Sequence, residues 1–175
     1  MTATDVRITP PMIMLPVREF VGTRKLIDVC TQPDNPSGAD MFYTEQTDGL
    51  ARVWGTSLLS ASDATWWCNP PFSAIMPWVD KAVMEARHGG EGLFLSRADV
   101  RTAWFKKLRM NCDARCNIGR SVAFLKPRDG GGYENMPGDF YGYAIWYFGC
   151  RRRRFERVFS NLGEVVHSLG VQEEA

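Results

Sequence analysis

The sequence lacks any apolar run long enough to cross a membrane. Spanning the hydrocarbon core of a bilayer takes about 18 to 20 consecutive apolar residues, and the 175 residues contain no such stretch. The N-terminal segment MTATDVRITPPM also lacks the basic and apolar regions of a secretory signal. We therefore expect no membrane partner and a cytoplasmic location.

Cysteines are few and irregularly spaced. Their odd number, five, suits reduced thiols better than a disulfide framework. Cys112 and Cys116 have the spacing of half a zinc site, but no second pair of Cys or His follows at ligand spacing. We expect no metal. The remaining cysteines are Cys30, Cys68 and Cys150.

Charge shows no overall excess of either sign, with 21 basic and 20 acidic side chains. Its distribution is uneven, because residues 97–157 hold 14 basic and 6 acidic side chains, a balance of +8, and the rest of the chain holds 7 and 14, a balance of −7. Such a basic half predicts a one-sided surface for phosphate groups, and the alternative is a solvated face. The candidates for phosphate contacts are Arg120, Lys126, Arg128, Arg151, Arg152, Arg153 and Arg154.

Short apolar runs alternate with helical periodicity, which predicts an α/β fold whose sheet is mostly parallel with an antiparallel C-terminal edge. Residues 1–150 are expected to form the main domain. Residues 151–175, a basic run and an amphipathic helix, are expected to pack on it. The predicted strands are 25–30, 64–68, 92–96, 121–125 and 143–148, and the predicted helices are 77–87, 101–110 and 155–169.

Asn69, Pro70, Pro71 and Phe72 follow the predicted strand 64–68 directly. Ligands of open α/β sheets bind outside the carboxyl ends of strands. The amide oxygen of Asn69 and the carbonyl of Pro70 can accept hydrogen bonds from an exocyclic amino group, and two prolines fix the backbone that presents them. The Phe72 ring can stack on a base. We predict a site for a flipped, amino-bearing base, and the alternative is a strand that ends in an Asn-Pro turn.

The tetrapeptide resembles the (Asp/Asn/Ser)-Pro-Pro-(Tyr/Phe) motif of amino methyltransferases, and the wider chain resembles the phage-type DNA N6-adenine methyltransferase (Dam) family. The resemblance extends over roughly residues 9 to 148 and depends on the order of several segments. These are Thr9-Pro10, Leu26 to Cys30, Phe42 to Glu45, Asp48-Gly49-Leu50, Trp54 and Trp67 to Ser73, followed by Trp78 to Ala82, Leu95 to Asp99, Trp104-Phe105, Gly119-Arg120 and Phe124 to Lys126.

The resemblance implies an enzyme that transfers a methyl group from S-adenosylmethionine to adenine N6 in DNA, with the base held at residues 69–72. It also implies a reduced Rossmann-like methyltransferase sheet, a methyltransferase domain over residues 1–150, and DNA as the partner of the basic residues. The protein would act as a monomer or homodimer, in the host cytoplasm if a phage encodes it. For the cofactor, the resemblance implies Thr9, Pro10, Asp28, Cys30, Phe42, Thr44 and Asp48.

Two of these cofactor candidates have specific expected partners. Asp28 would bind the methionine ammonium or a ribose hydroxyl, because a carboxylate at a strand end can serve either group; the alternative is a solvated strand terminus. Asp48 would accept a hydrogen bond from the adenine amine or the ribose, and the alternative is a turn residue before Gly49. Phe42 and Thr44 would line the adenosine pocket.

One feature of many methyltransferases is missing, the Phe-x-Gly-x-Gly loop after the first strand. No glycine occurs between Asp28 and Gly38, so close backbone approach to the methionine moiety has no support from the sequence. Two alternatives therefore stay open. The first is a methyltransferase for an RNA base or a protein glutamine, whose amino groups are similar, and the second is a catalytically degenerate DNA-binding protein.

Overall fold

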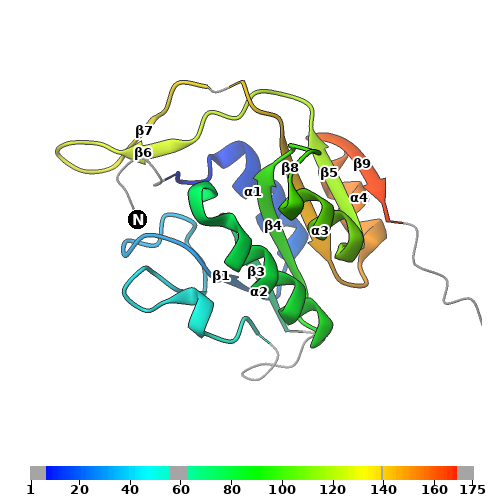
Figure 1. The fold of residues 1–175 in the computed structure, drawn as a ribbon. Helices are drawn as coiled ribbons and strands as arrows, with labels where there is room; N and C mark the ends of the chain where they lie inside the picture. The colour runs from blue at the N-terminus through cyan, green and yellow to red at the C-terminus, as the bar shows by residue number, and fades with distance from the viewer. Residues whose placement is uncertain (1–6, 56–62, 139, 169–175) are drawn as a thin grey trace, which may run out of the picture.

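The computed structural model describes residues 7–55, 63–138 and 140–168. A seven-stranded sheet in the order β2-β1-β3-β4-β8-β5-β9 forms its centre (Figure 1). Strands β1 to β4 pair in parallel, whereas β8, β5 and β9 join through antiparallel pairs. The predicted mixed sheet with an antiparallel C-terminal edge is confirmed. The strands are β1 Lys25–Asp28, β2 Met41–Phe42, β3 Ala64–Cys68, β4 Gly92–Arg97, β5 Ala114–Ile118, β8 Tyr143–Phe148 and β9 Gly163–His167.

Helices cover both faces of this sheet (Figure 1). On one face lie α1 Pro11–Val21 and α4 Arg152–Phe159, and on the other lie α2 Ile75–Arg87 and α3 Ala103–Asn111. Two short 3-10 turns, η2 Gly49–Ala51 and η3 Phe72–Ala74, follow the carboxyl ends of strands. Among the described residues, no helix is long and apolar enough to span a membrane.

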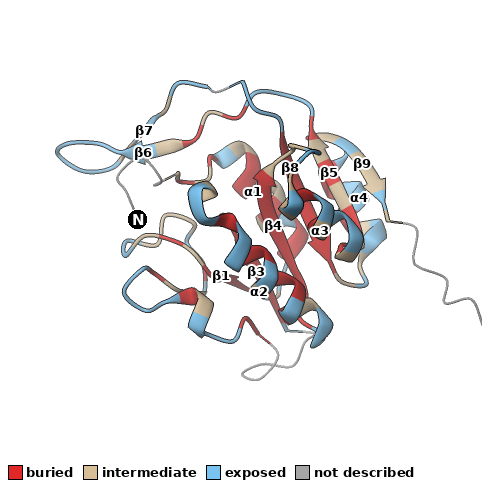
Figure 2. Ribbon diagram, viewed as in Figure 1, coloured by how far each residue is buried: buried red, intermediate tan, exposed pale blue. Residues whose placement is uncertain are grey.

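The alternation of side chains along each strand builds two separate cores, which Figure 2 shows as buried strands between the helices. Trp67 points into the core beneath α1 and α4, and its neighbour Trp66 points into the core beneath α2 and α3. Both side chains are fully buried. Because each large aromatic removes about 150–250 Å² from water, these residues contribute much of the hydrophobic stabilisation that holds the strand ends in place.

Two expected elements are wrong, and both errors concern the side of the sheet that β5 and β9 form. Residues 121–125 were expected to form a strand, but the strand β5 is residues 114–118 and only Leu125 of the expected run is in a strand, β6. In β5 buried residues alternate with half-buried ones such as Arg115 and Asn117, so no continuous apolar run marks it.

The expected helix over residues 155–169 ends early. Helix α4 stops at Phe159, and Gly163–His167 forms β9, which pairs with β5. Gly163 approaches the Asn117 carbonyl so closely that a β-carbon would collide with it, which fixes the point where this strand starts. The sequence pattern did not predict helix α1. It begins at Pro11, where the missing N–H costs nothing, but Pro16 inside it weakens the helical signal in the sequence.

A small hairpin, β6 Leu125–Pro127 and β7 Tyr133–Asn135, projects from the body of the molecule (Figure 1). It is anchored at two points, because Ile8 pairs with Leu125 at its base and the hydroxyl of Tyr133, beside its loop, donates to the Asp34 carboxylate. Both anchors belong to segments that border the carboxyl ends of the parallel strands. The hairpin therefore lies beside that edge of the sheet.

Candidate functional site

The order in which strands are added to the sheet reverses between β1 and β3, although the two strands are parallel. From β1 the chain goes to β2 on one side, and later returns to β3 on the other side of β1. In α/β sheets a crevice opens outside the carboxyl ends of two such strands, and ligands bind there. Asp28 is the last residue of β1, and Asn69 follows the last residue of β3.

The side chain of Asn69 is held in one orientation. Its amide nitrogen Nδ2 donates to the Arg7 carbonyl at 2.7 Å and to Thr9 Oγ1 at 3.0 Å. The amide oxygen Oδ1 is buried and has no hydrogen-bond partner among the described residues. A buried acceptor without a donor costs about 1–3 kcal/mol, so the arrangement favours a ligand that supplies an N–H or O–H at this point.

The residues after Asn69 present an aromatic ring at the same edge. Pro70 is buried, and Pro71 caps the 3-10 turn that begins at Phe72. The half-buried Phe72 ring packs against Phe124 and Tyr143, with ring centroids 6.1 and 5.8 Å apart. These contacts fix the ring beside Asn69. All four residues of the predicted motif therefore lie together.

Two arginines lie close to this ring. The guanidinium carbon of Arg7 lies 5.8 Å from the Phe72 ring centroid, and that of Arg97 lies 5.6 Å from it. Arg97 is the last residue of β4, the strand that pairs with β3. The aromatic surface beside Asn69 is therefore bordered by positive charge, which favours a phosphate-bearing ligand.

Two adjoining pockets open at the carboxyl ends of β1 and β3, and both are lined by Cys30 and Pro71. The first is narrow and is lined by Asp28, Ser37, Thr9 and Asn69 among others. The second has a volume of about 230 Å³ and is lined by Thr44, Glu45, Asp48, Gly49 and Trp78 among others. The predicted cofactor residues Asp28, Cys30, Thr44, Asp48 and Thr9 are thus brought together here.

Asp28 is the most unusual group in these pockets. Its side chain is buried, and burial raises the pKa of this carboxyl to about 6, although hydrogen bonds from Ser37, the Cys30 N–H and Thr31 and the charge of Arg18 oppose the change. The Cys30 N–H to Asp28 Oδ1 distance is 3.2 Å. A carboxylate held at such a cost in a pocket is typical of a ligand site. Burial also raises the pKa of the Cys30 thiol, which stays neutral.

Two acidic residues after β2 line the wider pocket. Asp48 has a left-handed backbone, with φ of 49°, and its carboxylate accepts from the Leu50 N–H at 3.1 Å. Glu45 follows the buried Thr44. The wider pocket is therefore lined both by carboxylates that can accept hydrogen bonds and by the indole of Trp78.

Two predicted cofactor residues lie apart from these pockets. Phe42 lies on the edge strand β2 with 38% of its surface exposed, and Pro10 caps the start of α1. Neither residue lines either pocket.

The pocket-lining residues that the sequence did not predict include Arg7, Ser37, Glu45 and Trp78. Glu45 had a usable signal, because it ends Phe42 to Glu45, one of the ordered segments that carry the family resemblance. Arg7 had none, because its place beside Phe72 depends on the tertiary fold.

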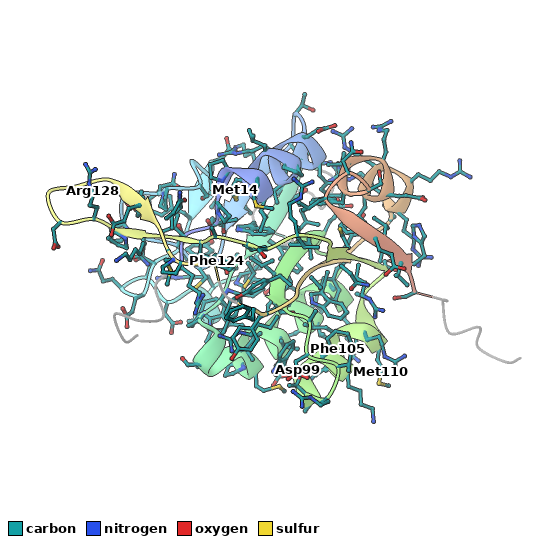
Figure 3. The ribbon with its side chains drawn as sticks, turned by 90° about the horizontal axis from the view of Figure 1, so that it is seen from above. Met14, Asp99, Phe105, Met110, Phe124 and Arg128 are labelled. Atoms are coloured by element: carbon teal, nitrogen blue, oxygen red, sulfur yellow. The ribbon has the colours of Figure 1, made fainter. Side chains whose placement is uncertain are left out.

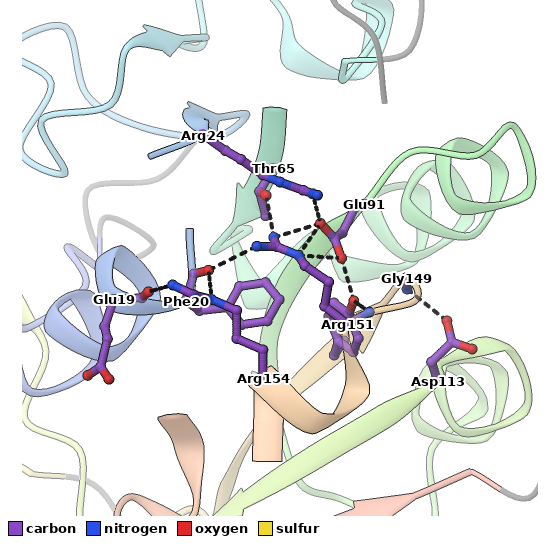
Figure 4. A network of polar contacts seen from close by, with 10 residues as sticks. Glu19, Phe20, Arg24, Thr65, Glu91, Asp113, Gly149, Arg151 and Arg154 are labelled. Atoms are coloured by element: carbon purple, nitrogen blue, oxygen red, sulfur yellow. Dashed lines mark hydrogen bonds and ion pairs between the residues drawn. The ribbon is translucent and has the colours of Figure 1, made fainter. Parts of the chain in front are cut away.

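The arginine run 151–154 follows the last residue of β8, at the end of the sheet opposite to the pockets. Strand β8 leads away from Tyr143, beside Phe72, to Phe148, a distance of about 17 Å at the usual rise per residue. Arg151 contacts the Glu91 carboxylate at 2.6–3.0 Å, donates to Thr65, and covers the Phe20 ring at 4.4 Å (Figure 4).

The neighbours of Arg151 also have partners within the chain. Arg154 donates to the Phe20 carbonyl at 2.8 Å, and Arg152 pairs with Asp113 at 2.8 Å. Arg153 is exposed. The structure thus separates this run from the pockets.

The other predicted phosphate contacts lie on the pocket side. Arg120 is exposed two residues beyond the end of β5, a strand that runs parallel to β4, and it donates to the Asn161 carbonyl. Lys126 pairs with Glu134 across the hairpin at 3.0 Å. Arg128 lies at the outer end of the hairpin, far from Phe124 (Figure 3). In the described part of the chain, no group of three or more His, Cys, Asp or Glu could hold a metal.

Comparison with known proteins bears directly on these pockets. The sequence model of the family described as DNA N-6-adenine-methyltransferase (Dam) matches residues 2–137. A protein of Escherichia phage T1 named DNA N-6-adenine-methyltransferase is 35% identical over 72 residues, which are 41% of this chain and 28% of the phage protein. The chain thus spans less than a third of that relative. The family match confirms the resemblance that the ordered segments predicted and covers both pockets.

Proposed function

Because the chain belongs to the DNA N-6-adenine-methyltransferase (Dam) family, we propose that it transfers a methyl group from S-adenosylmethionine to N6 of adenine in DNA. One observation carries this proposal. The buried Oδ1 of Asn69 has no hydrogen-bond partner among the described residues, and it lies beside the Phe72 ring and the two pockets. An exocyclic amino group would supply the hydrogen bond that this oxygen lacks.

The sheet supports a reduced Rossmann-like methyltransferase fold. Strands β1 to β4 are parallel, their order reverses between β1 and β3, and β8 is inserted antiparallel between β4 and β5. The pockets lie where such a sheet binds a nucleoside-containing ligand.

The pocket residues fit the methyl donor in chemistry. Asp28, a buried carboxylate in the narrow pocket, would hold the cationic ammonium group, and its pKa of about 6 leaves it mostly ionised at neutral pH. Glu45 or Asp48 in the wider pocket would accept hydrogen bonds from the ribose hydroxyls. Trp78 offers a face to the adenine ring of the donor. When bound, the donor supplies a methyl group on positively charged sulfur, which an amine can attack.

The residues 69–72 would prepare the amine for that attack. Asn69 Oδ1 and the Pro70 carbonyl would accept the two amino hydrogens and draw the lone pair out of conjugation with the ring. Arg7 and Thr9 keep the Asn69 amide from turning, because both accept from its nitrogen. Phe72, braced by Phe124 and Tyr143, would stack on the extruded base.

DNA would lie across the edge that carries the pockets. The hairpin bearing Lys126 and Arg128 projects beside this edge, and Arg120 is exposed along it. Arg7 and Arg97 border the Phe72 ring. These positive groups would contact phosphates and position the duplex.

A methyl-transfer assay tests the proposal. We expect labelled methyl groups from S-adenosylmethionine to appear in DNA as N6-methyladenine, and Asn69→Ala to lower the rate by at least about 100-fold. Titration calorimetry of the same variant should show nearly unchanged cofactor binding, because Asn69 acts on the target amine.

The assay also separates the alternatives. Label in RNA or in glutamine of a protein substrate would change the substrate class. DNA binding without transfer to any substrate would indicate a degenerate enzyme. A loss of cofactor affinity in Asn69→Ala as large as the loss of rate would assign this residue to the cofactor.

A further inference from the structure

Two exposed aromatic side chains follow one another just before β8. Phe140 is fully exposed and Tyr141 is 53% exposed. Large aromatic side chains in water forgo the free energy of burial, so an adjacent exposed pair points to a surface that binds something.

The chain after this pair leads straight to the proposed base-binding ring. The guanidinium carbon of Arg97 lies 3.9 Å from the Tyr141 ring centroid and 5.6 Å from that of Phe72. The Ala98 N–H donates to the Gly142 carbonyl at 2.8 Å, which ties the end of the loop to the end of β4. Tyr143, three residues after Phe140, contacts Phe72 at 5.8 Å. Phe140 is therefore within about 11 Å of Tyr143 by chain length alone.

The proposed reaction would leave a vacant position in the base stack of the DNA. An adenine that leaves the duplex for the catalytic pocket breaks its stacking on both neighbours, at a cost of a few kcal/mol. Apolar side chains of DNA-binding proteins can enter between bases, and an aromatic ring in the vacated position would stack on the neighbouring bases and restore part of the lost stacking. The side chain best suited to this task is an exposed, apolar ring on a positively charged edge, since phosphates would flank it.

We propose that Phe140 enters the space that the target adenine vacates in the base stack, while Tyr141, stacked on Arg97, anchors the loop. This inference rests on the proposed function and adds a binding role for Phe140. The division of labour follows from exposure and contact. The ring of Phe140 is fully exposed to a partner, whereas Tyr141 is already engaged by a cation.

The experiment compares Phe140→Ala with Phe140→Trp and with Met110→Ala. Met110, at the far end of α3, is 66% exposed and is a matched apolar control remote from Phe124 (Figure 3). Each variant is assayed for methyl transfer on three oligonucleotides: a duplex with a normal target A·T pair, the same duplex with an abasic site opposite the target, and a single strand. Thermal unfolding confirms that each variant is folded.

We expect Phe140→Ala to lower kcat/KM on the normal duplex by about 5- to 150-fold, the equivalent of about 1–3 kcal/mol for one stacked base. The loss should shrink opposite an abasic site and vanish on the single strand, where no stack needs filling. Phe140→Trp should restore activity, and Met110→Ala should match the wild type. The fluorescence of 2-aminopurine at the target position should rise less on binding Phe140→Ala than on binding the wild type.

The outcomes separate the two proposals. A wild type that methylates DNA, together with a Phe140→Ala variant that is unimpaired or equally impaired on all three oligonucleotides, would overturn the role of Phe140 alone. A wild type that methylates none of them would overturn the proposed function and this inference with it.

Discussion

Replacing Asp28 by Asn separates the stability of the fold from the binding of the methyl donor. The carboxyl is buried beneath the loop that follows β1, and burial raises its pKa from 3.8 to about 6. Asn keeps the size of the side chain and an acceptor for the Cys30 N–H but cannot ionise. The substitution therefore removes the buried charge and little else.

The sign of the effect follows from the raised pKa. Between about pH 4 and pH 6 the folded protein binds a proton at Asp28 that the unfolded chain has lost, so stability falls as pH rises through this window and stays low above it. At about 1.36 kcal/mol per pKa unit, the deficit at pH 7.5 is about 3 kcal/mol. At pH 4 it is about 0.5 kcal/mol.

We therefore expect Asp28→Asn to raise the free energy of unfolding of the cofactor-free protein by up to about 3 kcal/mol at pH 7.5, and to leave it nearly unchanged at pH 4. Urea unfolding at the two pH values measures this. Asp129→Asn, which removes an exposed carboxylate at the outer end of the hairpin, is the matched control. A variant less stable than the wild type at pH 7.5, or a gain of equal size at both pH values, would refute the reasoning.

The same variant should bind the donor poorly. A charged hydrogen bond is worth about 1.5–3 kcal/mol, so loss of the carboxylate should raise the Kd for S-adenosylmethionine by about 10- to 150-fold. Calorimetric titration at pH 7.5 reports this directly. An unchanged Kd would mean that Asp28 does not contact the ammonium group.

Two further predictions concern the base and the DNA. Phe72→Ala should weaken extrusion of the target base, whereas Phe72→Tyr should preserve it, as 2-aminopurine fluorescence at the target position will report; an equal signal from all three proteins would deny the ring a stacking role. Neutralising Lys126 and Arg128 to Gln should flatten the log-log dependence of DNA affinity on salt by about one to two units, while Arg152→Gln with Arg154→Gln should leave the slope unchanged, and filter binding at several salt concentrations distinguishes the pairs.

The part of the fold that the sequence predicted well is the part where burial is continuous. Strands β3, β4 and β8 are buried on both faces, and each appears in the sequence as a largely apolar run. Strand β9 lies at the edge and β5 pairs with it, and in both strands polar side chains interrupt the pattern. Their pairing depends on contacts between segments distant in sequence, and local periodicity carries no record of these contacts.

The site followed the same rule. Asn69 and Asp28 could be proposed as site residues because strand ends are local features, and the sheet brings the two ends together. Arg7 enters the narrow pocket through a segment whose path depends on the whole fold. The orientation of the Asn69 amide could not be predicted at all, because the carbonyl that fixes it belongs to Arg7, 62 residues earlier in the chain.

The basic half of the chain shows why a count of charges cannot locate a DNA-binding surface. Strand β8 runs from the end of the sheet that carries the pockets to the opposite end, so Arg97, beside its start, and the run 151–154, beyond its last residue, lie at opposite ends. At one end Arg97 borders an aromatic ring, and at the other Arg151 pairs with the nearly buried Glu91. Arg151 shares the buried Glu91 carboxylate with Arg24, so removing Arg151 would leave this charge with one cation in place of two, and Arg151 therefore serves stability. A charge balance summed over residues 97–157 adds these two populations together, and the path of a single strand separates them.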